Sequence, residues 1–355
     1  MNICFRVDAS TIIGTGHVMR CITLAEELKK NDHNVYFICR LHKGHLSELI
    51  LRKGFQVFNL DEPTQNRDLL VTKHAPWLGV TLEQDALETQ KVVSSNKLQC
   101  DWMIVDHYAI DKSWEQSIKS YVPNIMVIDD IADREHDCSI LLDQNYYQNA
   151  NDRYSDLVPS TCRLLLGPQY ALLRDEFIKF HNSPKNIKVN KSALIFYGGS
   201  DPINETLKAI NAIKGKDILA HVVVGPSNPN KEIIKKNCAT GNILFHYNIN
   251  YMAKLMHEVD FALCAGGSTT WERYCVGTPA IVTGVADNQI ELCENAQHLG
   301  VDHYIGTHDS ITQSKIENEL ELFLEKRDIP LLNKRAKDIV DGHGKSRIID
   351  LLNNI

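Results

Sequence analysis

The sequence lacks a long hydrophobic run, since no apolar stretch approaches the ~20 residues that a helix needs to span a bilayer. Arg6 and Asp8 already interrupt the first segment, so we expect no signal peptide there. Positive charge is also scarce, with 38 basic against 45 acidic residues, a net charge of −7 and no basic block. Such a chain is a poor candidate for binding nucleic acid or anionic membranes. We therefore expect a cytoplasmic protein with no membrane insertion and no nucleic-acid partner.

Cysteine patterning of the kind that marks disulfide or zinc frameworks is absent as well. The ten cysteines form no Cys-x-x-Cys pair and no Cys/His zinc spacing, and several lie in apolar segments. In a chain of 355 residues this is typical of reduced, buried thiols. The length suffices for about two domains with separate cores.

Short β-rich segments alternate with helical patterns along the chain. The first series runs from NICFRVD at 2–8 to CRLLLG at 162–167, and the second from SALIFYGG at 192–199 to PAIVTGV at 279–285. Strands that alternate with helices predict parallel sheets of the α/β class. The polar, aperiodic stretch at 180–192 separates the two series.

We therefore predict two doubly wound domains. The N-terminal domain covers residues 1–180, the C-terminal domain covers 181–340, and a closing helix covers 341–355.

Two glycine motifs imitate nucleotide loops, but each lacks a required residue. In GHGKS at 342–346, Ile339 stands where a P-loop needs its first glycine. In GTGHVM at 14–19, Met19 replaces the third glycine of a dinucleotide fingerprint, and Arg40 stands where an NAD ribose needs an acid. We expect neither a P-loop nor a nicotinamide site.

The carboxyl ends of the predicted strands carry the candidate site, as is usual for parallel α/β sheets. Gly14, Gly16 and His17 follow the first strand. The glycines allow the backbone to approach a ligand closely, and the helix that starts there offers free N–H groups. A helix start favours neutral imidazole, which suits a general base. The alternative is a histidine with only local hydrogen bonds.

Polar residues also follow two later strands. After DWMIV come Asp106, His107 and Tyr108, where a carboxylate can orient an imidazole and a phenol can donate to a leaving oxygen or a sugar. Solvent-facing loop residues are the alternative there. Asp129 and Asp130 follow the next strand, and no histidine or further acid stands at a helpful spacing. We expect a structural role for this pair rather than metal binding.

The second half repeats the glycine-rich turn. Gly199 and Ser200 precede a predicted helix with Asp201 as its N-cap and Pro202 at its first position, a ready anion site. Gly267, Ser268 and Thr269 open another helix, in which Glu272 lies one turn in.

A carboxylate such as Glu272 can accept two hydrogen bonds from a ribose diol, and Asn288 and Gln289 follow a further strand. This set predicts a nucleotide-sugar site. The C-terminal domain would hold the diphosphate and the ribose, and His17 and Tyr108 would face the sugar across a cleft.

Seven segments together resemble one enzyme family: FRVDASTIIGTGHVMRC, IVDHYAID, LLDQN, GPQYALLRDEF, FYGGSDP, AGGSTTWERYCVGTPAIV and DNQ. The chain resembles, over nearly its whole length, the UDP-sugar hydrolases of pseudaminic-acid (nonulosonate) biosynthesis. Their substrate is UDP-2,4-diacetamido-2,4,6-trideoxy-β-L-altropyranose. The family is similar in fold to the GT-B glycosyltransferases, notably the one that makes lipid II.

The resemblance implies a GT-B-like fold of two Rossmann-like domains, and inverting, metal- and cofactor-free hydrolysis at the anomeric C–O bond. UDP and a free sugar for glycan biosynthesis would be released. His17 would be the catalytic base or acid/base, with Tyr108 and Asn288 completing the sugar site. The implied substrate-binding residues are Gly14, Gly16, Arg20, Asp106, His107, Gly199, Ser200, Gly267, Ser268, Thr269, Glu272 and Gln289.

Two alternatives remain open at this point. A GT-B glycosyltransferase that uses a UDP-sugar donor needs an acceptor pocket, and lipid-linked versions show an apolar or basic patch, for which only residues 41–54 are a modest candidate. A non-catalytic nucleotide-sugar binding module does not need His17. We expect a monomer or a weak oligomer.

Overall fold

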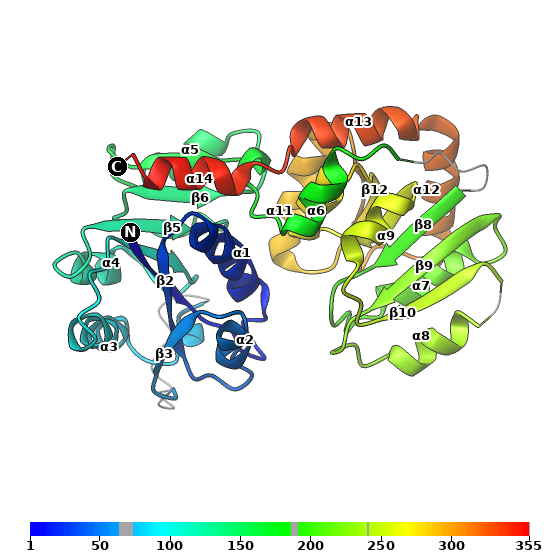
Figure 1. Ribbon diagram of the computed structural model, residues 1–355. Helices are drawn as coiled ribbons and strands as arrows, with labels where there is room; N and C mark the ends of the chain where they lie inside the picture. Colours follow the sequence, from blue (N-terminus) through cyan, green and yellow to red (C-terminus); the bar gives the residue numbers. More distant parts are fainter. Residues whose placement is uncertain (64–73, 186–190, 240, 355) are drawn as a thin grey trace. The chain divides into compact units, whose positions relative to one another are not determined.

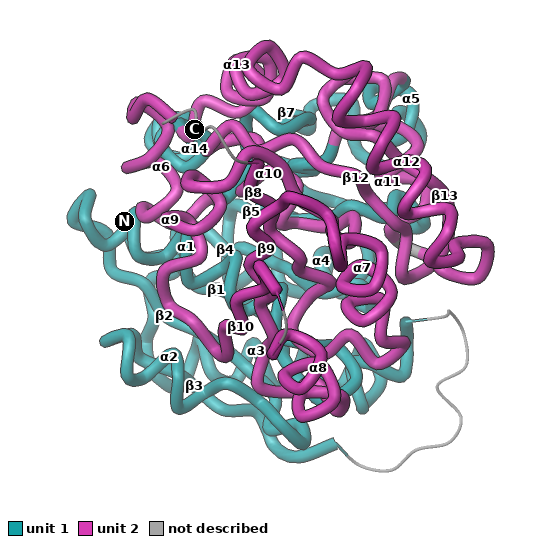
Figure 2. The backbone as a smooth tube through the Cα atoms, turned by 90° about the vertical axis from the view of Figure 1, so that its right-hand side faces the viewer, with its two compact units in different colours: residues 1–145, 149–172, 343–355 teal, residues 146–148, 173–342 magenta. Residues whose placement is uncertain are grey.

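The computed structural model describes residues 1–63, 74–185, 191–239 and 241–354 (Figure 1). The chain forms two compact units (Figure 2). Unit 1 comprises residues 1–145, 149–172 and 343–355, and unit 2 comprises 146–148 and 173–342.

Unit 1 contains a sheet of seven parallel strands in the order β3-β2-β1-β4-β5-β6-β7. Its strands are β1 (Asn2–Val7), β2 (Asn34–Arg40), β3 (Gln56–Leu60), β4 (Trp102–Asp106), β5 (Asn124–Ile128), β6 (Ile140–Asp143) and β7 (Arg163–Leu166). The order reverses between β1 and β4, so the loops after these two strands diverge at a topological switch point, where ligands of such sheets bind.

Helices cover both faces of this sheet. They are α1 (Gly16–Lys30), α2 (Ser47–Arg52), α3 (Leu82–Ser95), α4 (Lys112–Ile118), α5 (Ala150–Tyr154) and α14 (Gly344–Leu352), with short 3-10 helices η1 (Ala75–Trp77) and η2 (Pro168–Tyr170). The apolar residues of α1 pack in one core cluster with residues of α14, and Trp114 and Ile118 of α4 belong to the cluster on the other face. The C-terminal helix α14 thus completes the core of unit 1.

Unit 2 contains six parallel strands in the order β10-β9-β8-β11-β12-β13, with its switch point between β8 and β11. The strands are β8 (Lys191–Phe196), β9 (Ile218–Val224), β10 (Ile243–Tyr247), β11 (Phe261–Ala265), β12 (Ala280–Gly284) and β13 (His303–Thr307). The helices are α6 (Asp175–His181), α7 (Glu205–Ile213), α8 (Lys231–Asn237), α9 (Met252–Glu258), α10 (Thr269–Cys275), α11 (Asp287–Ala296), α12 (Gln313–Lys326) and α13 (Ile329–Ile339), with the 3-10 helix η3 (Gln297–Leu299).

These two sheets confirm the predicted α/β class with two doubly wound parallel domains. All ten cysteines carry free thiols, and only Cys162 is not fully buried. Over the described ranges, no helix combines the length and the apolar character that crossing a bilayer requires.

The start of α7 differs from the expectation. The helix begins at Glu205 rather than Pro202, and its N-cap is Asn204. The backbone first closes a tight turn, in which Asn204 N–H donates to Asp201 O over 3.1 Å, and both residues have positive φ. The Asp201 carboxylate still accepts from the N–H groups of Glu205 and Thr206, at 2.9 and 3.0 Å. Asp201 therefore satisfies the helix amides from outside the helix.

Candidate active site

The switch point of unit 1 brings together a histidine and a carboxylate that are far apart in the chain. His17 lies in the first turn of α1, after the loop that follows β1, and Asp106 is the last residue of β4. The two strands pair in parallel, with Val7 opposite Asp106. His17 Nδ1 lies 2.6 Å from Asp106 Oδ1. Both residues are buried, Asp106 completely.

The charge of Asp106 decides which nitrogen of His17 carries the proton. Burial by itself raises the pKa of Asp106, but the Arg20 guanidinium and the His17 imidazole outweigh it and lower that pKa below its usual range. An ionised carboxylate only accepts hydrogen bonds, so the hydrogen in this contact resides on His17 Nδ1. Neutral His17 then has its lone pair on Nε2, as a general base requires.

Arg20 joins this pair to a second carboxylate. Its Nε and Nη2 donate to the two oxygens of Asp106 at 2.6 and 2.7 Å, a bidentate contact, and its Nη1 donates to Asp130 Oδ2 at 2.9 Å. Arg20 lies one helical turn after His17 on α1, which places both side chains on the same face. One guanidinium therefore fixes both carboxylates.

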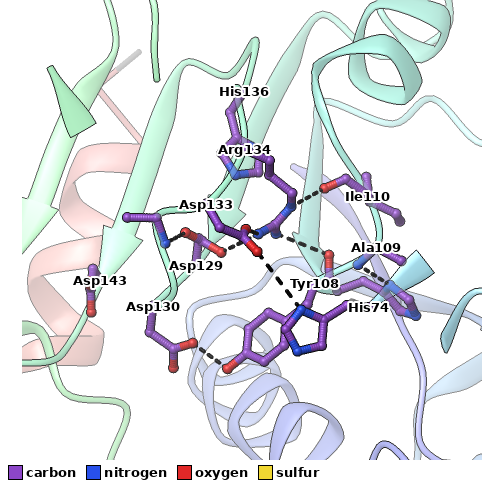
Figure 3. A network of polar contacts seen from close by, with 12 residues as sticks. His74, Tyr108, Ala109, Ile110, Asp129, Asp130, Asp133, Arg134, His136 and Asp143 are labelled. Carbon is purple, nitrogen blue, oxygen red and sulfur yellow. Dashed lines mark hydrogen bonds and ion pairs between the residues drawn. The ribbon is translucent and has the colours of Figure 1, made fainter. Parts of the chain in front are cut away.

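Tyr108 completes the group. Its hydroxyl donates to Asp130 Oδ1, and Figure 3 shows the two side chains pointing toward each other. Burial and the charge of Asp130 raise the pKa of the Tyr108 phenol well above its usual range. The Tyr108 ring meets the His17 ring edge-on, with 4.6 Å between centroids. The sequence predicted that this phenol donates to a substrate, whereas here its hydrogen is held by Asp130.

Two aromatic neighbours of Tyr108 were not predicted. Trp77 of η1 stacks on Tyr108 at 5.4 Å, and His74 lies 4.8 Å from Trp77, again between ring centroids. Trp77 also meets the edge of His17 at 6.2 Å. These residues belong to a connection without helical or strand periodicity, so no local pattern placed them beside Tyr108.

His107 points into a different environment. Its Nε2 lies 3.3 Å from Asp8 Oδ2, and its Nδ1 accepts from the N–H of Ala109. Side chains alternate across an extended strand end, so Asp106 and Tyr108 share a side that His107 does not. The structure brings two of these three residues to His17, and no contact between His107 and His17 is found in the described part of the chain.

A buried ionic cluster lies beside the loop after β1, and Arg40 is one of its cations. Arg6 donates to both oxygens of Asp85, at 3.0 and 2.6 Å, and to Asp8 at 2.7 Å. Arg40 donates to Asp85 and Glu88, both at 2.7 Å. Ion pairs this deep require mutual compensation. Arg40 is thus a structural cation.

The two carboxylates after β5, Asp129 and Asp130, contact different partners. Asp129 accepts from Arg134 Nη1, the Ala132 amide and the Tyr154 hydroxyl, as expected for a structural residue. Asp130 contacts Tyr108 and Arg20 instead. Among the residues that the structure describes, no three His, Cys, Asp or Glu side chains are arranged to hold a metal ion.

In unit 2, the turn at Gly199 and Ser200 fits less well as an anion site. The leading amides of α7 are already taken by Asp201. Gly199 instead packs against Gly225, which follows β9. A Cβ added to Gly225 would lie 2.3 Å from the carbonyl oxygen of Gly199, so the two glycines allow close backbone packing.

The second glycine turn of unit 2 gathers more of the predicted residues. Ser268 precedes α10 without a side-chain cap bond, and Thr269 is the first residue of that helix. A Cβ at Gly267 would lie 3.7 Å from Nε2 of Gln289, so the first turn of α11 lies beside this glycine turn. Asn288 belongs to α11, but its side chain lies outside the described residues.

Glu272 of α10 has a cation as its partner. Arg174 Nη2 donates to Glu272 Oε1 at 3.1 Å, and Arg174 also pairs with Glu176. Burial raises the pKa of Glu272, and Arg174 opposes that rise. The side chain of Glu272 remains 18% exposed. Arg174 comes from the GPQYALLRDEF segment and was missed as a partner of Glu272.

The two doubly wound sheets define a protein of the GT-B fold class. Of the solved structures, MurG of Acinetobacter baumannii covers 100% of the chain with a TM-score of 0.68 and 12% identity, over 99% of its own length. The calicheamicin glycosyltransferase CalG4 covers 99% with a TM-score of 0.67 and 13% identity, over 97% of its own length.

The curated relatives are more specific. The chain is 27% identical over 269 residues to the UDP-2,4-diacetamido-2,4,6-trideoxy-β-L-altropyranose hydrolase of Campylobacter jejuni, covering 76% of this chain and 86% of that protein. It is 26% identical over 367 residues to the uncharacterized protein MJ1062 of Methanocaldococcus jannaschii, covering 100% and 66%. The spore coat polysaccharide biosynthesis protein SpsG of Bacillus subtilis is 24% identical over 218 residues, covering 58% and 64%.

These names confirm the resemblance that the motifs indicated. The chain spans about two thirds of the length of MJ1062 and of SpsG. No family model matches the chain.

Proposed function

We propose that this protein hydrolyses a UDP-activated amino sugar, with His17 as the general base. The observation that carries the proposal is the 2.6 Å contact between His17 Nδ1 and the buried, ionised Asp106. It assigns a lone pair to Nε2 and holds the ring in place. A carboxylate behind an imidazole also stabilises the imidazolium that forms when the base takes a proton.

In the proposed reaction, a water molecule attacks the anomeric carbon from the face opposite UDP. His17 Nε2 accepts one water proton as the new C–O bond forms. The bond from the anomeric carbon to the phosphate oxygen breaks, and its electron pair leaves with UDP. One displacement inverts the configuration at that carbon. Hydrolysis by this route consumes one water and releases UDP, the sugar and a proton.

Unit 2 is the proposed nucleotide-binding unit. Glu272 would accept hydrogen bonds from the two ribose hydroxyls, and Ser268 and Thr269 would contact the phosphates. Support comes from the partial exposure of the Glu272 side chain and from Gln289 of α11, which lies beside the Gly267 turn. We propose that Gly199 and Ser200 lie near the phosphates without α7 amides binding them, since the Asp201 carboxylate already accepts hydrogen bonds from the first amides of α7.

The proposed substrate is UDP-2,4-diacetamido-2,4,6-trideoxy-β-L-altrose, which rests on the name of the Campylobacter relative. A glycosyltransferase with a UDP-sugar donor is the second candidate, favoured by the folds of MurG and CalG4. Incubation with a panel of UDP-sugars without any acceptor, followed by NMR, separates the two. A hydrolase forms free sugar and UDP in equal amounts, whereas a transferase leaves the donor intact.

A further inference from the structure

Tyr108 and Asp130 form a second pair that parallels His17 and Asp106. In each pair an aromatic group with a transferable proton faces a carboxylate. Arg20 donates to the carboxylate of both pairs. Asp130 uses Oδ1 for the Tyr108 hydroxyl and Oδ2 for Arg20, so its orientation is set from two sides. Figure 3 shows Asp130 extending from its loop to the phenol.

We propose that Asp130 is a positioning residue that captures the hydroxyl hydrogen of Tyr108, so that the phenol oxygen acts as a hydrogen-bond acceptor for the attacking water. This inference rests on the proposed hydrolysis. It reverses the role predicted from the sequence, in which the phenol donates to the substrate. A phenol has one hydrogen, and once that hydrogen is given to a carboxylate, only lone pairs remain for a ligand.

Two acceptors side by side orient a water molecule for attack. With one hydrogen directed to His17 Nε2 and the other to the Tyr108 oxygen, a lone pair of the water is left for the anomeric carbon. During the displacement His17 takes one proton, and the electron pair of the broken bond departs with UDP. Tyr108 keeps its hydroxyl hydrogen, which stays donated to Asp130. The His17 and Tyr108 rings are in edge-on contact, with 4.6 Å between centroids, so both acceptors belong to neighbouring side chains.

The neighbouring acids do not offer this contact. Asp129 is committed to Arg134, Ala132 and Tyr154. Asp133 pairs with Arg134 and lies 3.9 Å from His74, with a side chain that is 44% exposed. The side chain of Asp130 is only 16% exposed. Asp133 is therefore a matched control, an acid of the same loop that does not contact the phenol.

A double-mutant cycle tests the inference. Asp130→Asn, Tyr108→Phe and the double variant are compared with Asp133→Asn for UDP release. Asp130→Asn should lower kcat by about 10- to 100-fold with KM within about twofold, because a charge-assisted hydrogen bond is lost. If Asp130 acts through Tyr108, the double variant is no slower than Tyr108→Phe alone. Multiplying losses would overturn the inference.

A measurement without substrate checks the same contact. Since Asp130 raises the pKa of Tyr108, Asp130→Asn should lower the phenol pKa in a titration followed by tyrosine-selective ¹³C NMR, and Asp133→Asn should not. An unchanged Tyr108 titration would overturn the inference. Arg20 also holds Asp106 by a bidentate contact that does not involve Asp130, so we expect the variant to fold, and an unchanged melting temperature verifies this. A wild-type protein that hydrolyses no UDP-sugar would instead refute the proposed function.

Discussion

His17 is the residue on which the proposed chemistry depends, and its environment is specific. Asp106 fixes the tautomer, Arg20 fixes Asp106, and the Tyr108 ring packs against the imidazole edge. The ligand-binding residues proposed for UDP lie on other elements, in unit 2. Proton transfer and nucleotide binding should therefore respond separately to substitution.

Replacing His17 tests that separation. His17→Leu should lower kcat by about 10²- to 10⁴-fold or more, because the general base is removed. UDP affinity, measured by calorimetry, should stay within about twofold of the wild type. His45→Leu is the control, since His45 contacts Ser47 rather than Asp106. UDP release from His17→Leu at the wild-type rate would rule out His17 as the base.

Glu272 is the corresponding residue for the nucleotide. Glu272→Gln should weaken UDP binding by about 10-fold or more, because hydrogen bonds to a charged acceptor are lost. Binding of 2′-deoxy-UDP should suffer less, since one ribose hydroxyl is already missing. Glu176→Gln is the control, because Glu176 pairs with the same Arg174. Equal losses for both nucleotides would remove Glu272 from the ribose site.

At the scale of elements, strand ends determine what the sequence could predict. Apolar runs and their alternation with helices predicted both sheets, and parallel strands necessarily gather their carboxyl ends at one edge. That rule placed His17 near Asp106 and Tyr108. The rule did not predict that the His107 side chain points away from His17. Proximity to a strand end does not say on which side of the strand a residue lies, and side chains alternate between the two sides. The rule also missed the turn at Asp201–Asn204, where a left-handed residue delays α7.

Contacts between distant residues explain the remaining misses. Arg6 and Asp85 are 79 positions apart, and Trp77 reaches Tyr108 from a connection without periodicity. Nothing local distinguishes these residues from ordinary surface charges or an isolated aromatic residue. Only the folded arrangement pairs them.

The packing of Gly199 against Gly225 provides a test at this scale. Gly225→Ala should destabilise unit 2 by about 1–3 kcal/mol, because its Cβ would lie 2.3 Å from a backbone oxygen. Gly199→Ala is the control, since its Cβ would have no neighbour within 4 Å. Denaturant unfolding measures both. Equal stability of the two variants would contradict the packing described.

At the scale of the molecule, the two units should respond differently to acid. In unit 1 the pKa values of Asp8, Asp85 and Asp106 are below the usual range, because partner cations outweigh the effect of burial. Such carboxylates contribute stability that is present above the unfolded Asp pKa of about 3.9 and is lost as the pH falls below it. The raised pKa of Asp143, caused by burial and Asp130, opposes this trend only in part.

Two carboxylates of unit 2 show the opposite sign. Burial raises the pKa values of Glu205 and Glu272, so their contribution is fully present at low pH and is lost as the pH rises through the folded values. Between about pH 4 and pH 2, pepsin should therefore cut unit 1 first, with the cleavage sites mapped by mass spectrometry. First cuts in unit 2 would contradict the assignment of these shifts.

Oxygen labelling shows whether this protein hydrolyses a UDP-sugar at the anomeric carbon. The protein is incubated with UDP-2,4-diacetamido-2,4,6-trideoxy-β-L-altrose in H₂¹⁸O with EDTA, and early products are analysed by mass spectrometry and NMR. We expect ¹⁸O in the sugar, none in UDP, and an inverted first anomer. Label in UDP, or no free sugar without an acceptor, would contradict it.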